Sequence, residues 1–382
     1  MALRTIVKKP IRYALDLGVD FLLLTIKLTD RLFNDETEVP SAPADSFDAL
    51  RIQEKDRFEA ILNREIRQIK AEHVETRLCP NCNSDSYQLF FTTQDLFDYV
   101  KCQKCGFVYA LQMLKHETRT VLYGGLTGSE AVKFCCSPEG IEADSQRFEL
   151  PLKLIRKYQR SGDLLDVGCG VGNFLNQARK AGFSVQGVET HEEFREAAKA
   201  NDGIDVRTGI FEQMDLPKSH YKVVTMWETL EHIYDPKAAV GKAFEILAPM
   251  GILAISVPNL ANFGFFVLRE YSSHRGGEHI NFFSPATLSR MLSDNGFTIV
   301  EVHTTENSDW RAVMNLLNLN LGNLYCYSNV GKKNENTPAV SFFHRHELSF
   351  LNRIVFPLLS RYERRTGRGS GITILAQKKT ER

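Results

Sequence analysis

The sequence predicts an α/β fold in which a parallel sheet carries helices on both faces, preceded by a small cysteine-rich module and by helical extensions. After residue 162, strand-like apolar runs alternate with helical patterns, which is typical of such a sheet. Two CxxC pairs stand ahead of that alternation. The chain has 382 residues, 43% of them hydrophobic, so we expect two or three units with a substantial core.

Five stretches follow one another along the chain. They are an amphipathic helical segment at 1–34, a linker and charged helix at 35–77, the cysteine-rich module at 78–110, connecting helices at 111–162, and the α/β domain at 163–382 with a helical insert at about 304–369. A helix is expected near Glu139 to Tyr158. The strands expected after it are Asp163 to Val167, Val185 to Glu189, Val223 to Trp227, Gly251 to Val257, Thr298 to His303 and Gly371 to Ala376.

Two segments combine apolar and basic side chains. In residues 1–34, apolar residues recur at roughly helical spacing, with Pro10 as a break and four basic residues near the start. In residues 340–368, apolar residues lie among six arginines and only two acids. Such segments suit peripheral contact with an anionic membrane surface. Packing within the protein, or across a homodimer, is the alternative and explains them slightly better.

The two CxxC pairs predict a zinc ribbon. Cys79 and Cys82 (CPNC) are separated by nineteen residues from Cys102 and Cys105 (CQKC), a spacing that leaves a strand hairpin between two knuckles. Four thiolates can close tetrahedrally on Zn²⁺ and leave no position for water, so the metal is expected to be structural.

The remaining cysteines bear on the compartment of the protein. Cys135, Cys136, Cys169 and Cys326 show no pairing pattern, and a chain with a large core does not need disulfides, so we expect a cytoplasmic protein with free thiols. No cleavable signal peptide is evident. The longest uncharged stretch, Ile246 to Leu268, is interrupted by proline, glycine and asparagine, and is expected to be a buried strand followed by a loop.

A glycine-rich turn predicts a ligand site in the α/β domain. The sequence LLDVGCGVGNFL runs from a strand through Gly168, Gly170 and Gly172 into a helix, and glycines let the backbone approach a ligand closely. The spacing is GxGxG, not the GxGxxG of dinucleotide sites. The next strand ends in Glu189, about 20 residues on, where a carboxylate can accept hydrogen bonds from two ribose hydroxyls.

These residues resemble the class I, Rossmann-like family of S-adenosylmethionine (SAM) dependent methyltransferases. GIFEQMDL is similar to the adenine-side segment of the family, and TMWETLEHIYDP, LAPMGILAISVPN, GEHINFFSPATLSRMLSDNGF and GITILAQKK follow its order. The chain departs from the family at Tyr221 and Lys222, where an acid is usual. The resemblance implies SAM as cofactor, with contacts from Asp166, Gly168, Cys169, Gly170, Gly172, Glu189, Thr190, Ile210, Phe211, Trp227 and Glu228.

Two histidines are the candidate general bases for methyl transfer to a hydroxyl. His232 follows Glu231 beyond the fourth strand, and His279 follows the fifth, so both fall where parallel sheets bind ligands. Glu228 or Glu231 is positioned to orient one imidazole, which gives Glu231 a catalytic role beside the two histidines. The alternative for these histidines is purely structural, as a helix cap and a packed loop residue.

The expected function is methylation of a hydroxyl on a glycan, a sugar nucleotide or a lipid-linked acceptor. A zinc ribbon ahead of this domain resembles bacterial methyltransferases of surface polysaccharide and natural-product pathways. A nucleic-acid methyltransferase is one alternative, but the net charge is zero and the basic residues near the knuckles are only Arg77, Lys101 and Lys104. A SAM-binding scaffold without activity is another, and the intact glycine turn opposes it.

Overall fold

The computed structural model describes residues 74–92, 97–115, 131–262, 279–304 and 365–379. All of them belong to one compact unit. The predicted helical segment at 1–34, nearly all of the linker and charged helix, and most of the insert lie outside the described residues. The basic apolar stretch at 340–368 also lies outside them, apart from its last four residues.

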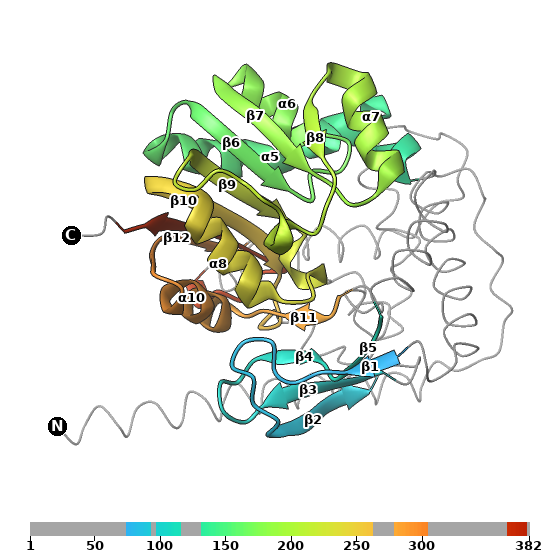
Figure 1. Ribbon diagram of the computed structural model, residues 1–382, viewed down its shortest axis with the longest axis vertical. Coiled ribbons are helices and arrows are strands. Elements are labelled where there is room, and N and C mark those ends of the chain that lie inside the picture. Colours follow the sequence, from blue (N-terminus) through green and yellow to red (C-terminus); the bar gives the residue numbers. More distant parts are fainter. Residues whose placement is uncertain (1–73, 93–96, 116–130, 263–278, 305–364, 380–382) are drawn as a thin grey trace, which may run out of the picture. The chain divides into compact units, whose positions relative to one another are not determined.

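A seven-stranded sheet forms the centre of the α/β domain (Figure 1). Its strands are β6 (Gly162–Val167), β7 (Phe183–Val188), β8 (Asp205–Arg207), β9 (Tyr221–Trp227), β10 (Leu247–Pro258), β12 (Phe297–Thr304) and β13 (Gly371–Lys378). The order across the sheet is β12-β13-β10-β9-β6-β7-β8. The run from β8 to β10 is parallel, and Leu164 of β6 is in register with Val185 of β7 and Val223 of β9.

Alternate residues of the strands fill two separate apolar cores, one on each face of the sheet. Leu164, Val223 and Ile252 pack with α5 (Pro138–Tyr158), α6 (Asn173–Lys180) and α7 (Glu192–Asp202). Their neighbours Leu165, Val224 and Leu253 pack with α8 (Pro236–Ile246) and α10 (Pro285–Asp294). Because both faces are covered, the central strands β9 and β10 are buried at most positions. The predicted α/β sheet with helices on both faces is confirmed.

The structure corrects the predicted sheet in two places. The last strand, β13, runs antiparallel to both β10 and β12, although the alternation predicted a parallel sheet. Burial on both faces makes a strand apolar whichever way it runs, so the pattern carried no directional signal. Strand β8 was not predicted, since it has only three residues and one fully buried side chain, Val206.

A four-stranded sheet holds the cysteine-rich module. It consists of β2 (Tyr87–Thr92), β3 (Asp98–Cys102), β4 (Val108–Ala110) and β11 (Asn281–Phe282), with β2 and β3 as the hairpin expected between the knuckles. Strands β1 (Val74–Thr76) and β5 (Gln112–Leu114) pair outside the predicted module, in stretches expected to be a charged helix and connecting helices. Among the described residues, no helix is both long and apolar enough to cross a membrane.

Strand β11 belongs to the α/β domain in sequence but in structure to the four-stranded sheet of the cysteine-rich module, which we call the ribbon. Asn281 and Phe282 pair antiparallel with Tyr109 and Val108 of β4. The ring of Phe282 meets Tyr99 of β3 edge to face, with centroids 5.0 Å apart. The ribbon sheet is therefore completed by a segment that lies about 180 residues further along the chain.

The guanidinium of Arg77 fixes this junction. Its Nε donates to the carbonyl of Ala110 (3.0 Å), Nη1 donates to the carbonyl of Tyr234 (2.9 Å), and Nη2 donates to both the carbonyl of Ile280 (2.6 Å) and Oδ1 of Asn281 (3.0 Å). Arg77 is only 7% exposed. The flat five-donor fork of arginine suits such an arrangement, which a lysine ammonium cannot copy.

We expect Arg77→Met to lower the free energy of unfolding by about 3 kcal/mol, because it leaves several buried acceptors without their charged donor. The exposed Arg156 of α5 supplies the control, and Arg156→Met should cost less than about 0.5 kcal/mol. Urea unfolding of both variants measures the difference. Equal stability of the two variants would show that the Arg77 junction contributes nothing.

Candidate functional site

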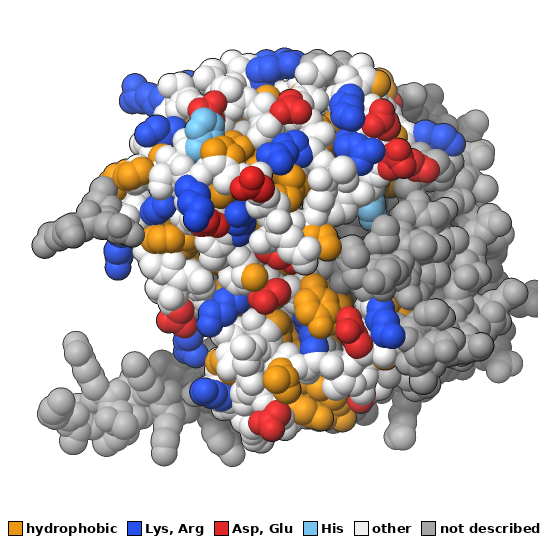
Figure 2. Space-filling model, in the orientation of Figure 1, with side chains coloured by type: hydrophobic (Ala, Val, Ile, Leu, Met, Phe, Trp, Pro, Cys, Tyr) orange, Lys and Arg blue, Asp and Glu red, His pale blue; other side chains and the backbone are white. Residues whose placement is uncertain are grey.

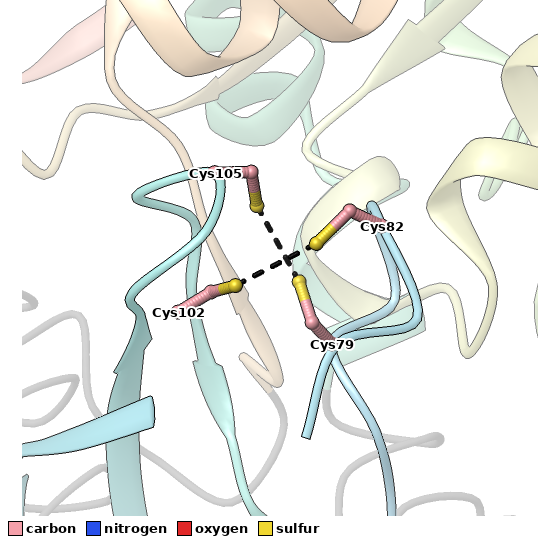
Figure 3. Close-up of side chains that lie close together, drawn as sticks. All are labelled: Cys79, Cys82, Cys102 and Cys105. Atoms are coloured by element: carbon pink, nitrogen blue, oxygen red, sulfur yellow. Dashed lines mark hydrogen bonds between the residues drawn. The ribbon is translucent and has the colours of Figure 1, made fainter. Parts of the chain in front are cut away.

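The four predicted zinc ligands converge on one point. Figure 3 shows the side chains of Cys79, Cys82, Cys102 and Cys105 facing one another, with Sγ to Sγ distances of 3.5 Å for Cys79 and Cys105 and 3.6 Å for Cys82 and Cys102. Four sulfurs at about 2.3 Å from a tetrahedral Zn²⁺ lie about 3.8 Å apart. The cluster is thus only slightly tighter than a loaded site and can hold that ion.

Backbone hydrogen bonds shape both knuckles in the same way. The N–H of Asn83 donates to the carbonyl of Cys79, and the N–H of Gly106 donates to the carbonyl of Cys102. Burial raises the pKa of the Cys79 thiol. Cys102 is also desolvated, but hydrogen bonds from the backbone of Cys105 and Lys104 lower its pKa to about 7. Such bonds favour the thiolate, which is the form that binds a metal.

The glycine turn lies between β6 and α6 and requires glycine at its first position. Gly168 has φ of +73°, and a Cβ there would come within 2.5 Å of Oγ1 of Thr229. Gly170 has φ of +55°, and its would-be Cβ is 3.8 Å from Phe194. Substitution at Gly170 is thus opposed by the backbone conformation and not by crowding. The turn is pinned to β7, because the N–H groups of Gly168 and Cys169 donate to the carbonyl of Val188.

Glu189 brings its carboxylate back to this turn from the end of β7. Its Oε2 accepts from the N–H of Gly170 at 3.0 Å, and its Oε1 accepts from the N–H of His191 at 2.9 Å. The next residue, Thr190, is exposed. The predicted ribose carboxylate therefore lies at the glycine turn.

Asp166 and Cys169, two further predicted cofactor contacts, are buried behind the turn. Asp166 is 1% exposed, and its Oδ1 accepts from the hydroxyl of Thr225 at 2.6 Å. Burial, with the charge of Glu189 adding to it, raises the pKa of Asp166 to about 8. Cys169 packs into the core beside Gly187, whose Cβ would come within 2.5 Å of its sulfur. Burial raises the pKa of the Cys169 thiol as well.

Aromatic side chains pack around Trp227, a predicted cofactor contact, in one of the two apolar cores. Trp227, at the end of β9, packs edge to face on Phe174 with centroids 5.0 Å apart, and Phe148 lies 5.8 Å away. The indole Nε1 of Trp227 is buried and has no hydrogen-bond partner among the described residues. On the adenine side, Phe211 is buried in the core whereas Ile210 is only half-buried. The Ile210 side chain is thus the more accessible of the predicted pair.

The three predicted catalytic residues meet beyond the end of β9. One carboxylate oxygen of Glu231 and one imidazole nitrogen each of His232 and His279 lie within 4.8 Å of one another. The centroids of the two imidazole rings are 4.7 Å apart. Glu231 is 1% exposed, and neither carboxylate oxygen has a hydrogen-bond partner among the described residues. Burial, and then the charge of Glu228, raise the pKa of Glu231 well above its usual range.

Glu228 connects this cluster to α5 and to β10. It has φ of +49°, an uncommon conformation for a residue with a side chain. Its Oε1 accepts from the hydroxyl of Ser256 at 3.2 Å and lies 3.8 Å from Nη2 of Arg147. Strained backbone of this kind is often found at functional sites.

The ribbon junction holds His279 in place, which sequence reasoning did not find. The hydroxyl of Tyr99 in β3 donates to the carbonyl of His279 at 3.0 Å, and the N–H of Ile280 donates to the carbonyl of Glu231 at 3.0 Å. The amide of Asn281 donates to carbonyls around Glu231, the shortest bond being 2.6 Å to Ile233. In the sequence, Tyr99 and Asn281 belong to no motif that would have predicted these contacts.

Comparison with known proteins identifies part of the chain. Residues 143–302 match a family model described as a methyltransferase domain. Over 150 residues the chain is 31% identical to a ubiquinone biosynthesis O-methyltransferase of Bradyrhizobium sp. (strain ORS 278), covering 36% of this chain and 59% of that protein. It is 29% identical over 153 residues to a protein of the same name from Psychrobacter arcticus, covering 35% and 58%. The chain thus spans less than two thirds of these relatives.

The chain is also similar to solved structures, at lower sequence identity. A SAM dependent methyltransferase from Archaeoglobus fulgidus is similar with a TM-score of 0.42 and 19% identity, over 64% of this chain and 96% of that one. The observed sheet, with its parallel run and single antiparallel strand, has the Rossmann-like class I methyltransferase fold.

The buried carboxyl of Asp166 should make stability depend on pH. Its pKa of about 8 in the folded protein lies above the ordinary value of 3.8, so between these pH values the folded state holds a proton that the unfolded state has released. The stability from this group is complete below about pH 4 and declines as the pH rises towards 8, by up to about 1.4 kcal/mol per pH unit. We expect Asp166→Asn, which cannot ionise, to lose less stability than the native chain over this range.

Urea unfolding of both proteins at about pH 5 and about pH 7.5 isolates the effect, since all other groups are shared. If both proteins lose the same free energy of unfolding between the two conditions, the carboxyl of Asp166 is not protonated in the folded state.

Proposed function

From the methyltransferase domain at residues 143–302, we propose that this chain is a SAM-dependent methyltransferase that transfers the methyl group to a hydroxyl oxygen. The proposal depends above all on the contact between Glu189 and the N–H of Gly170, because it places a carboxylate at a glycine turn on the carboxyl edge of a parallel sheet. The names of the relatives, ubiquinone biosynthesis O-methyltransferases, support oxygen as the accepting atom. The glycan acceptor class rests on the sequence resemblance of the ribbon alone.

The cofactor side of the proposed site is the turn between β6 and α6. SAM, when bound, supplies a methyl group on a positively charged sulfur. The carboxylate of Glu189 would accept hydrogen bonds from the ribose hydroxyls, and Ile210 and Trp227 would flank the adenine. Gly168 and Gly170 keep the turn free of side chains, so that the backbone can approach the cofactor.

The acceptor side is the cluster of Glu231, His232 and His279. It is close to the turn, since Thr229 lies two residues before Glu231 and contacts Gly168. Transfer breaks the bond between sulfur and methyl carbon while a bond from the acceptor oxygen to that carbon forms, and the hydroxyl proton must leave. An imidazole of the cluster can accept that proton, which is worth about 10² to 10⁴ in rate.

We also propose that the ribbon holds one structural Zn²⁺. Thiolates at all four positions leave none for a water or a substrate, so this ion would take no part in the transfer. Its contribution would be to folding, and through β11 to the segment that ends at His279.

The placement of the basic side chains argues against a nucleic-acid substrate. Arg77, one of the three basic residues near the knuckles, is buried in the ribbon junction and cannot meet a phosphate. On the face shown in Figure 2, acidic and basic side chains are interspersed and not gathered into a basic stripe. The main proposal therefore keeps a small-molecule or glycan acceptor.

We expect S-adenosylhomocysteine (SAH), the demethylated cofactor, to bind the native chain, and Gly170→Val or Glu189→Gln to weaken it at least about tenfold, or by about 1.4 kcal/mol. The control is Gly203→Val. Gly203 has a similar φ of +63° and equally open surroundings, but it ends α7, away from the turn. Calorimetric titration with SAH compares the variants. Weakening by Gly203→Val as strong as that by Gly170→Val would remove the cofactor assignment.

The purified chain should carry one zinc per molecule in the ribbon. Cys79→Ser should lose both metal and stability, because the binding energy of a structural site is folding energy. Cys136→Ser, which changes a half-buried cysteine outside the cluster, should keep the metal. Elemental analysis decides the matter, and equal zinc content in Cys79→Ser and Cys136→Ser would contradict the ribbon site.

A further inference from the structure

A cavity of about 420 Å³ lies between the ribbon and the first turns of α10. Its described lining shares no residue with the glycine turn or with the acceptor-side cluster. The lining combines the basic Lys101 and Arg290, the hydroxyls of Ser284 and Thr287, and an apolar surface that includes Phe90. Small-molecule sites commonly have volumes of about 300–1,000 Å³ and set a few polar groups in an apolar hollow. The cavity therefore has the size and the lining of a ligand site.

A bulge in β2 supplies the aromatic side chain of this cavity. Leu89 pairs with Val100 and Phe91 pairs with Tyr99, so Phe90 is one residue more than the facing stretch of β3 contains. A bulge of this kind re-aims a side chain, and such bulges are frequent beside functional sites. Phe90 lines the cavity and is 42% exposed. Its ring can therefore offer a face on which a flat group of a ligand stacks.

The two basic side chains of the cavity lie beside the second knuckle of the ribbon. Helix α10 lies next to the ribbon (Figure 1), and Nη1 of its Arg290 donates to the carbonyl of Cys105 at 3.1 Å. The stem of Lys101 passes Gly106, where a would-be Cβ is 4.0 Å from its Cε. No acid is among the described residues that line the cavity. The guanidinium has five N–H groups, so it can hold the carbonyl and still present a fork of donors to a phosphate.

The ribbon itself restricts which anion this cavity can hold. Cys105 is one of the lining residues, and four thiolates together exceed the charge of a Zn²⁺ ion. A bare anion is thus attracted by Lys101 and Arg290 but repelled by the loaded ribbon. Tight binding therefore needs a second contribution, and stacking of an attached group on Phe90 can supply it. These features together favour a phosphate joined to a flat, apolar body.

We propose that this cavity binds a nucleoside diphosphate. The base stacks on Phe90, and the phosphates contact Lys101 and Arg290. Oγ of Ser284 accepts from the N–H of Thr287 at 3.2 Å, and its own proton can be donated to a ligand oxygen. In an acceptor that carries such a nucleotide, the cavity anchors the part that does not react. That role rests on the proposed function, whereas binding of the nucleotide does not.

Calorimetric titration of the full chain, purified with its ribbon metal in place, tests the site with uridine diphosphate (UDP) as the probe. We expect one UDP per chain. Lys101→Gln and Arg290→Gln should each weaken this binding at least about tenfold, because each removes a charged contact to phosphate. Phe90→Ser should weaken it at least about tenfold as well, through loss of stacking. Uridine alone and inorganic phosphate alone should both bind more weakly than UDP, since each uses only part of the site.

Lys104→Gln is the matched control, since Lys104 is an exposed lysine of the same knuckle but is not among the described residues that line the cavity. It should bind UDP like the native chain, and equal zinc content in all variants shows that the ribbon is intact. The proposal is overturned if the native chain binds no UDP, if Lys101→Gln and Arg290→Gln bind it unchanged, or if Lys104→Gln weakens it equally. Inorganic phosphate that binds as tightly as UDP, or SAH that displaces UDP, also overturns it. Loss of SAH binding with UDP binding intact would contradict only the proposed function.

Discussion

The buried guanidinium of Arg77 is the interaction on which the arrangement of the site depends. It joins carbonyls of the ribbon and of the α/β domain, and it also binds the side chain of Asn281. Asn281 in turn binds the backbone on both sides of Glu231. The side chains of Arg77 and Asn281 therefore connect the cysteine-rich module to the backbone around Glu231. The cysteine-rich module thus contributes contacts to the segment that carries His279.

The topology of the sheet brings the other parts together. Strands β6, β7 and β9 are parallel neighbours, so the glycine turn, Glu189 and the Glu231 cluster all follow the same edge. Thr229 packs directly against Gly168, which ties the cofactor turn to the cluster. The side chains of Asp166, Trp227 and Glu231 are each buried. Electrostatic effects are stronger where water is excluded, which suits charge movement during transfer.

Sequence reasoning found the parts whose chemistry requires particular residue types at fixed spacing. The four cysteines, the glycine turn with Glu189, and the two histidines with Glu231 all come together where they were expected. It did not find the junction of Arg77, Tyr99 and Asn281. These contacts join positions that are distant in sequence and use carbonyl acceptors, which every residue has. The two-residue strand β11 was too short to leave a periodic pattern, and burial hid the direction of β13.

The most direct measurement is a crystal structure of the full chain grown with SAH. We expect the SAH ribose on the carboxylate of Glu189 and its sulfur facing the cluster of Glu231, His232 and His279. Cofactor density away from the glycine turn, or a sulfur that faces away from the cluster, would contradict the joint cofactor and acceptor site.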